Sequence, residues 1–234
     1  MLQTHDLHVT LDAEAGLVRA LDGLSLTLER GETFALVGES GCGKSMTALA
    51  LMRLLPDNGR IEQGSVDLGT DVPDGKPTEL LYLPECEMRR IRGGHVGIIF
   101  QEPATSLNPV MRVGDQIVEA IEAHTSLRGV AARRKAVDWL RRVGIPEPER
   151  RIDSYPFEMS GGQKQRVMIA MTLAAEPRYL IADEPTTALD VTIQKQVLDL
   201  LKALQQERQL GLLLITHDLG VVADMAHRVA LMYA

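Results

Sequence analysis

The sequence is poor in cysteine, and its two cysteines, Cys42 and Cys86, stand in no paired spacing. This excludes a disulfide framework and a zinc site built on cysteine pairs, and it fits a reducing interior. Long apolar runs are also lacking, because runs such as residues 211–215 fall far short of the roughly 20 residues that cross a bilayer. The first six residues contain neither a basic segment nor an apolar core, so no secretory signal is visible. We therefore predict a chain that does not itself cross a membrane.

Positive charge is in the minority. The sequence contains 25 Lys and Arg residues and 32 Asp and Glu residues, which gives a net charge of −7. Proteins that live on nucleic acid gather Lys and Arg against the phosphate backbone, so this balance argues against that class. With 234 residues, 45% of them hydrophobic, the chain has enough material for one sizeable domain or for a core with a small lobe.

Two kinds of strand pattern are present. Leu24, Leu26 and Leu28 alternate with polar residues, which predicts a half-buried strand of an antiparallel sheet, and residues 64–68 follow the same pattern. Other segments are short and continuously apolar, as is typical of parallel strands that helices cover on both faces. These segments are residues 33–37, 96–100, 179–182, 212–215 and 229–232.

Helical periodicity appears between these runs. Ile193, Val197 and Leu204 share one face together with Leu200 and Leu201, which predicts an amphipathic helix. Residues 114–143 are mostly helical in pattern and contain no parallel-strand run, so we expect a helical lobe inserted into an α/β core. Two segments interrupt the pattern as loops. They are residues 71–77, a surface loop rich in Gly, Pro and Asp, and residues 146–148, a rigid connector.

Residues 38–45 read GESGCGKS and match the phosphate-loop pattern G-x-x-x-x-G-K-[ST] at every fixed position. An apolar run precedes them and a helical stretch, residues 46–55, follows. Glycines let successive backbone N–H groups point inward, and the helix adds its positive N-terminus. We expect Lys44 to reach the β- and γ-phosphates and Ser45 to ligate Mg²⁺. The alternative is a chance glycine turn.

The residues predicted to bind nucleotide in this loop are Gly38, Glu39, Ser40, Gly41, Cys42, Gly43, Lys44, Ser45 and Met46. Cys42 fills a variable position of the pattern. We interpret it as a filler rather than a redox group.

Two carboxylates, Asp183 and Glu184, follow the apolar run 179–182. The carboxyl end of a strand is where α/β sheets place ligands, so we expect Asp183 to hold Mg²⁺ through water. Glu184 is then free to act as general base on an attacking water. The alternative is a pair of solvated acids, and the nearby phosphate loop argues against it. The sequence thus predicts hydrolysis of the terminal phosphate of a bound nucleoside triphosphate.

A second anion-binding helix start is predicted at residues 159–163, MSGGQ, before a helix at residues 164–175. A single triphosphate cannot easily use both helix starts, so we expect a head-to-tail pair in which each chain completes its partner's site. Gln101 follows an apolar strand, where its oxygen would ligate Mg²⁺ or water. His217 follows another, in position to touch a γ-phosphate. A structural role is the alternative for both side chains.

In this order, the motifs resemble the nucleotide-binding domain of an ABC transporter over nearly the whole chain. The matching motifs are the Walker A loop 38–45, the Q-loop at Gln101, the signature 160–163, Walker B ending at Asp183 and Glu184, the D-loop 188–190 and the switch histidine His217. The resemblance implies an α/β fold: a P-loop NTPase (RecA-like) core with an N-terminal antiparallel β-subdomain and an inserted α-helical subdomain. It also implies ATP and Mg²⁺ as cofactors, in an ATP-sandwich dimer.

The resemblance assigns roles to individual residues. It implies Glu184, His217, Gln101 and Lys44 as catalytic, and Ser45, Gln101 and Asp183 as metal ligands. Toward the nucleotide of the opposite chain it implies Ser160, Gly161, Gly162, Gln163 and, at the dimer seam, Asp190. Residues 1–234 form a single nucleotide-binding domain on this view, with a core of about 1–105 and 166–234 and a helical subdomain of about 106–165.

Residues 99–103, 106–109 and 183–192 are similar to those of importers of the dipeptide, oligopeptide, nickel and glutathione group. This implies an ATP-hydrolysing energy-coupling subunit, peripheral on the cytoplasmic face of the inner membrane. Its partners are integral membrane permease subunits, a second ATP-binding domain and, indirectly, an extracytoplasmic solute-binding protein, with no nucleic acid. We expect the permease contact around residues 107–113, with an ordinary lobe-to-core connection as the alternative.

The chain departs from this group at three points. Met159 replaces the usual leucine of the signature, a volume-conserving change that we expect to be harmless. The first 30 residues contain no aromatic residue, so an apolar contact near Leu17 and Val18 has to serve the nucleotide base. The chain stops at Ala234, where members usually continue, so we expect a truncated piece.

Two other functions fit parts of the pattern. A soluble mechanical ATPase acting on nucleic acid or ribosomes uses the same two phosphate cradles, but such proteins carry long coiled coils or basic extensions. Here the interval between Lys44 and Ser160 is compact and lacks sustained heptads. A regulatory ATP-binding module without turnover is disfavoured by the presence of Glu184.

Overall fold

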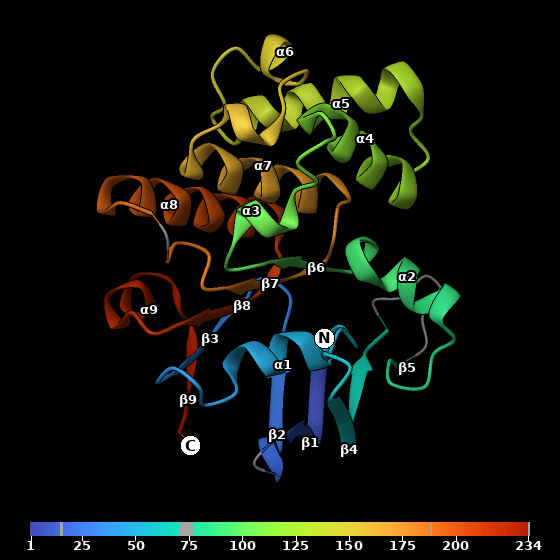
Figure 1. The fold of residues 1–234 in the computed structure, drawn as a ribbon, viewed down its shortest axis with the longest axis vertical. Helices are drawn as coiled ribbons and strands as arrows, with labels where there is room; N and C mark the ends of the chain where they lie inside the picture. Colours follow the sequence, from blue (N-terminus) through green and yellow to red (C-terminus); the bar gives the residue numbers. More distant parts are fainter. Residues whose placement is uncertain (15, 71–76, 188, 234) are drawn as a thin grey trace.

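In a computed structural model, which describes residues 1–14, 16–70, 77–187 and 189–233, the chain forms two sheets and a helical layer (Figure 1). The antiparallel sheet has the order β2-β1-β4-β5 and the parallel sheet the order β6-β7-β8-β3-β9. The first is built from β1 (Leu2–Ala13), β2 (Gly16–Leu28), β4 (Gly59–Leu68) and β5 (Thr78–Glu79). The second is built from β3 (Thr33–Gly38), β6 (Val96–Ile99), β7 (Tyr179–Asp183), β8 (Gly211–Thr216) and β9 (Arg228–Met232).

The helices are α1 (Lys44–Leu51), α2 (Glu85–Gly94), α3 (Pro103–Ser106), α4 (Val113–His124), α5 (Gly129–Arg142), α6 (Pro148–Arg151), a 3₁₀ turn η1 (Pro156–Glu158), α7 (Gly161–Ala174), α8 (Val191–Arg208) and α9 (Leu219–Met225). In Figure 1, α7 and α8 lie directly on one side of the parallel sheet, with α4, α5 and α6 beyond them. α1 and the antiparallel sheet lie on the other side. No helix within the described ranges combines the length and the apolar character needed to span a membrane.

The antiparallel pairing of β1 with β2 confirms the alternating pattern of the N-terminal strand. Leu2 pairs with Leu28 and Thr4 with Leu26. Leu2, Leu26 and Leu28 are all buried, while the side chains between them are more exposed. Alternation places one face of each strand against the core and leaves the other toward solvent.

The parallel sheet separates two apolar cores. Leu180 and Leu214 point into the core that the helices α4, α5, α7 and α8 share, whereas Ile181 and Leu213 point into the core that includes α1 and the antiparallel sheet. The prediction that helices cover both faces of these strands is therefore only partly right. On one side the antiparallel sheet does much of the covering, because its apolar face needs burial as well.

β9 is the strand that fits the prediction least. It pairs with β3 and stands last in the order of the sheet, so one of its edges has no neighbouring strand among the described residues. Val229 is 55% exposed and Leu231 is 66% exposed. An apolar run alone does not distinguish an edge strand from a central one, and here it predicted more burial than the structure has.

The predicted helix after the phosphate loop ends earlier than expected. α1 stops at Leu51 rather than at residue 55, because Arg53 takes a left-handed φ of 51°. The Arg53 guanidinium donates to the carbonyls of Leu80 and Leu83 at 3.1 and 2.6 Å. These bonds anchor the chain to the segment between β5 and α2 and turn it away from the helix axis.

The predicted helical character of residues 114–143 is confirmed by α4 and α5, in which Ile117 and Ile121 are fully buried. The short helix α3 lies in a segment for which the sequence pattern predicted no helix. The expected boundary at 165/166 lies inside α7, and the residue bounds of the core and of the helical subdomain stay a prediction. Of the expected surface loop 71–77, residues 71–76 lie outside the described residues.

Replacing Ile117 by alanine tests the core of the helical layer. The side chain is fully buried, so Ile117→Ala should lower the free energy of unfolding by about 2–5 kcal/mol, from lost apolar burial and the remaining cavity. Val130→Ala on α5 is the control, since Val130 is 88% exposed and its loss should change stability by less than about 0.5 kcal/mol. Urea unfolding followed by circular dichroism measures both. Equal losses would contradict the burial of Ile117.

Candidate functional site

The phosphate loop connects the end of β3 to the start of α1, as its sequence predicts. Gly43 caps the helix with a left-handed φ of 96°, and a Cβ there would lie 2.3 Å from the carbonyl oxygen of Ala20. Only glycine meets both conditions. The Lys44 side chain is 6% exposed, and its Nζ donates to the carbonyls of Gly38 and Glu39 at 2.8 and 2.7 Å. The ammonium therefore lies inside the curl of the loop.

Asp183 lies beside this loop at the end of β7. It is 7% exposed, and within the part of the chain that the structure describes its Oδ1 is buried without a hydrogen-bond partner. Burial raises the pKa of the carboxyl group. A hydrogen bond with Ser45 lowers this pKa, the charge of Glu184 raises it, and the charge of Lys44 lowers it. These three neighbours place Asp183 next to both the phosphate loop and the second acid.

This environment fits a magnesium ion. A buried carboxylate oxygen without a partner, next to Ser45 in the first turn of α1, offers the hard oxygen ligands that Mg²⁺ prefers. Within the described ranges, no group of three or more His, Cys, Asp or Glu side chains gathers into a metal site, here or elsewhere. A site with one carboxylate and one hydroxyl leaves the remaining positions to water and to phosphate oxygens.

Glu184 lies one residue further on, and its carboxylate collects three side chains. Thr187 Oγ1 donates to Oε2 at 2.8 Å, Gln101 Nε2 donates to the same oxygen at 3.3 Å, and His217 Nδ1 lies 3.2 Å from Oε1. The backbone of Glu184 has a left-handed φ of 45°, and its N–H donates to the carbonyl of Ile215 at 2.9 Å. The structure thus brings together Glu184, Gln101 and His217, all predicted from sequence.

Thr187 is a contact that the sequence analysis missed. Its hydroxyl reaches Glu184 because the turn after β7 folds back, with the N–H of Thr187 donating to the carbonyl of Glu184 at 3.3 Å. A hydroxyl three residues after an acid is a weak signal in a sequence. The two side chains meet because the backbone at Glu184 is left-handed. A sequence indicates that conformation mainly at Gly, Asn and Asp, so a glutamate gives no sign of it.

The second predicted anion cradle has the expected helix-start geometry. Ser160 caps α7: Gln163 N donates to its Oγ at 3.3 Å, and Ser160 N donates to Gln163 Oε1 at 3.1 Å. Asp190 caps α8 in the same way, accepting from Ile193 N at 3.0 Å. A Cβ on Gly162 would lie 2.7 Å from Ile193 Cγ2, so the two helix starts pack closely.

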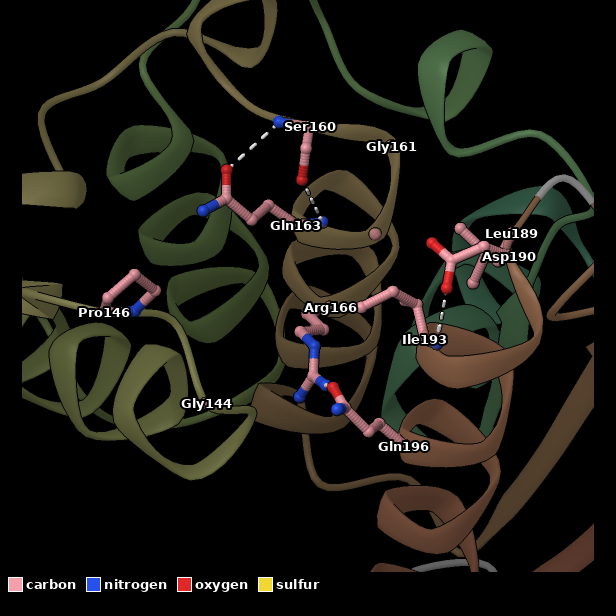
Figure 2. A pocket seen from close by; sticks show the side chains of 11 residues that line it. Gly144, Pro146, Ser160, Gly161, Gln163, Arg166, Leu189, Asp190, Ile193 and Gln196 are labelled. Carbon is pink, nitrogen blue, oxygen red and sulfur yellow. Dashed lines mark hydrogen bonds between the residues drawn. The ribbon is translucent and has the colours of Figure 1, made fainter.

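These residues line a hollow of about 420 Å³ (Figure 2). Its walls come from the starts of α7 and α8 and from the turn at Gly144 and Pro146, and they include no residue of the phosphate loop 38–45. The signature residues and the phosphate loop therefore occupy separate places in one chain. This separation is what the expected head-to-tail pairing requires.

The residues of the predicted base contact are exposed on the antiparallel sheet. Leu17 and Val18 lie on β2 near the hairpin with β1, and they are 68% and 48% exposed. Their apolar surface is accessible to a planar ligand. No aromatic residue lies on β1 or β2.

A comparison with protein families matches residues 21–187 to the ABC transporter family. Among curated relatives, the oligopeptide transport ATP-binding protein OppD of Bacillus subtilis is 50% identical over all of this chain and 64% of its own length. The dipeptide transport ATP-binding protein DppD of the same organism is 48% identical, with 68% of its length covered. The glutathione import ATP-binding protein GsiA of Salmonella typhimurium is 49% identical, with 37% covered. The chain thus spans less than two thirds of OppD's length.

Solved structures similar to this chain are also ABC transporter cassettes or parts of ABC transporters. The ATP-binding cassette MJ0796, in a dimeric post-hydrolysis state bound to ADP and Pi, has a TM-score of 0.84 and 27% identity, covering 99% of this chain and 94% of its own. The structure of cbiO1 from Clostridium perfringens has a TM-score of 0.76 and 28% identity, covering 99% and 84%. These neighbours confirm the predicted fold class, a P-loop NTPase core with an antiparallel β-subdomain and an inserted helical subdomain.

The raised pKa of Asp183 generates a test of its burial. The folded chain holds this proton more tightly than the unfolded chain, so the protonated group favours folding at low pH, and that contribution is lost as pH rises through the folded pKa. Without nucleotide and Mg²⁺, Asp183→Asn should therefore be more stable than the parent at pH 7. The difference should vanish below about pH 3.9, the pKa of an unfolded aspartate. Urea unfolding at both pH values measures this.

Asp199→Asn is the matched control for that measurement, since Asp199 lies exposed on α8. It should unfold like the parent at both pH values. A parent that is more stable at pH 7 than Asp183→Asn would show that the carboxylate is well solvated or paired, against the structure.

Proposed function

We propose that this chain, which belongs to the ABC transporter family, is the ATP-hydrolysing energy-coupling subunit of a solute importer. The observation that carries the proposal is the convergence at one edge of the parallel sheet. Glu184, Gln101 and His217 meet there, and Asp183 next to Glu184 lies beside Lys44 and Ser45 of the phosphate loop. A triphosphate bound by the loop would bring its terminal phosphate to this edge.

Binding uses groups that the fold has already oriented. Lys44, now bonded to the carbonyls of Gly38 and Glu39, would donate to the β- and γ-phosphates. The N-terminus of α1 adds its partial positive charge. Ser45 and Asp183, with Gln101, would hold Mg²⁺, which when bound supplies positive charge to the phosphate oxygens.

Hydrolysis needs a base for the attacking water, and Glu184 is in place for it. The water oxygen forms the new bond to the γ-phosphorus, the bond to the β–γ bridging oxygen breaks, and the water proton passes to the carboxylate of Glu184. His217 and Gln101 contact the two oxygens of that carboxylate and fix its orientation. We propose that both side chains also contact the γ-phosphate.

The site is completed by a second chain. Ser160, Gly161, Gly162, Gln163 and Asp190 form a cradle apart from the phosphate loop of their own chain, and a helix start of this kind binds anions. Paired head to tail, each copy would place this cradle over the triphosphate held by the other. We propose that the second domain is a copy of this chain or a related ATP-binding subunit.

The names of the similar proteins support a class of solute. OppD, DppD and GsiA are an oligopeptide transport, a dipeptide transport and a glutathione import protein. We propose peptides or a related small solute, such as glutathione or nickel, as the cargo of the assembly. The chain would work as a peripheral subunit on the cytoplasmic face of the membrane, bound to permease subunits and coupled through them to a solute-binding protein.

The permease contact is proposed on the helical layer. Of the predicted segment 107–113, Leu107 and Val113 are buried at 2% and 0% exposure and serve the lobe-to-core connection, whereas Val110 is 80% exposed. Phe157 is 70% exposed and stacks on Tyr155 at 5.4 Å.

Backbone hydrogen bonds hold the two exposed apolar side chains in neighbouring segments. Val113 N donates to the carbonyl of Ser154 at 2.9 Å, and Gly114 N donates to that of Ile152 at 2.8 Å. The loop that carries Val110 thus runs beside the loop that leads to Phe157. Exposed aromatic and aliphatic side chains gathered in this way are typical of protein interfaces.

The general base is tested by Glu184→Gln, which keeps the shape of the side chain but cannot accept the proton. ATP turnover should fall by about 100-fold or more, while ATP binding is kept and an ATP-bound dimer accumulates. Lys44→Ala should instead weaken ATP binding itself by about ten-fold or more. Phosphate release, equilibrium nucleotide binding and size-exclusion chromatography with ATP measure these effects. Undiminished turnover in Glu184→Gln would remove Glu184 from the role of base.

The permease contact is tested with Phe157→Asp in the full-length protein co-expressed with its membrane subunits. Loss of an exposed aromatic anchor should reduce the fraction that co-purifies with membranes by about ten-fold, without changing unfolding in urea. Val130→Asp is the control, because Val130 is also exposed and lies on α5. If both variants stay on the membrane like the parent, the contact lies elsewhere.

A further inference from the structure

We infer that Arg166 is a positioning residue for the surface that receives the partner copy's nucleotide, an inference that rests on the proposed function. We call this the receiving surface. It is the wall of the hollow in Figure 2, made of the turn at Gly144 and Pro146, residues 160–163 and residues 189–196. Three segments far apart in the sequence have to keep a fixed arrangement for one triphosphate to fit.

Arg166 hydrogen-bonds to both of the other segments. It lies on α7, three residues after Gln163, and its side chain runs along the wall of the hollow (Figure 2). Nη1 donates to the carbonyl of Val143 at 2.6 Å, just before the turn, and Nη2 donates to Gln196 Oε1 on α8 at 2.8 Å. A planar guanidinium holds two such donors in a fixed relation, which a lysine ammonium does not.

The turn is shaped around this guanidinium. Gly144 has a left-handed φ of 75°, and a Cβ there would lie 3.0 Å from Nη1 of Arg166. The backbone at Gly144 therefore passes close to the guanidinium of Arg166, because glycine has no side chain to keep them apart. Val143 is the C-cap residue of α5, and the carbonyls at the end of a helix have no partner within their own helix.

The bond to Gln196 fixes α8 relative to α7. α8 begins at the Asp190 cap, and α7 begins at the Ser160 cap. Gly162 and Ile193 pack these two starts together, but an apolar contact alone permits sliding. The hydrogen bond from Arg166 to Gln196 adds a directional constraint, so that Asp190 and Ser160 keep their separation. An error of about 1 Å in such an arrangement can cost about 100-fold in rate.

Arg166→Gln in the full-length protein tests this role. The variant should bind ATP at its own phosphate loop like the parent, because that loop is not part of the receiving surface. Its kcat should fall by about ten-fold, and in a Glu184→Gln background the ATP-driven dimer should form only at about ten-fold higher protein concentration. A merely structural role would not separate binding from dimer formation in this way.

Conservative variants separate the effect of the paired guanidinium donors of Arg166 from the effect of its charge. Arg166→Lys keeps the charge but not the paired donors, so it should be impaired nearly as much as Arg166→Gln. Gln196→Ala removes the acceptor for Nη2 and should therefore lose part of the parental turnover. Gln196 is exposed, so its variants should fold even if the Arg166 variants do not. Full turnover in Arg166→Lys or in Gln196→Ala would overturn the inference.

Arg142→Gln is the matched control. Arg142 also joins α5 to α8, through Glu207 at 2.6 Å, and it stacks on Trp139 at 4.7 Å, yet it lies outside the receiving surface. Its loss should lower stability to urea much as that of Arg166 does, with kcat and dimer formation like the parent. Equal impairment of both variants would show that general stability, not positioning, is at work. If the parent hydrolyses no ATP, or Glu184→Gln remains active, the proposed function itself fails.

Discussion

The pairing of β7 with β6 on one side and β8 on the other determines where Gln101, Glu184 and His217 lie. Ile99 of β6 pairs with Ala182, and Ile215 of β8 pairs with Asp183, so the three strands end at the same edge. Because this register aligns the strand ends, the side chains that follow them come within hydrogen-bonding distance of one another. They are Gln101, Glu184 and His217. A slip of two residues in either pair would separate the carboxylate from its partners by about 7 Å.

The fold keeps two charged groups in its interior for the same purpose. Lys44 and Asp183 are 6% and 7% exposed, and the Asp183 oxygen Oδ1 lacks a partner within the described part of the chain. Buried charges of this kind reduce the stability of the empty protein. A bound triphosphate with its cation would compensate both, so ligand binding and folding are thermodynamically linked at this site. The strained backbone at Glu184 belongs to the same pattern, since strain concentrates where function requires a fixed side chain.

Much of the fold could be predicted because it rests on local patterns: the apolar runs, the helical stripe around Val197 and the phosphate-loop motif. The early end of α1 and the exposure of β9 could not, since the first depends on the distant carbonyl of Leu83 and the second on the absence of a neighbouring strand among the described residues. Within the site, chain order was enough to nominate Gln101 and His217. The roles of Thr187 and Arg166 could not be predicted. The partner of Thr187 depends on the backbone conformation at Glu184, and the partners of Arg166 depend on how the helices pack.

The distance between the receiving surface and the phosphate loop of the same chain has a genetic consequence under the proposed pairing. Each catalytic unit is a composite, half from one copy and half from the other, related by a two-fold axis. A defect in Lys44 disables the unit of its own copy, whereas a defect in Ser160 disables that of its neighbour. Two inactive alleles, one of each kind, would therefore assemble into a dimer with one wholly intact unit, and inheritance of the two defects would show intragenic complementation.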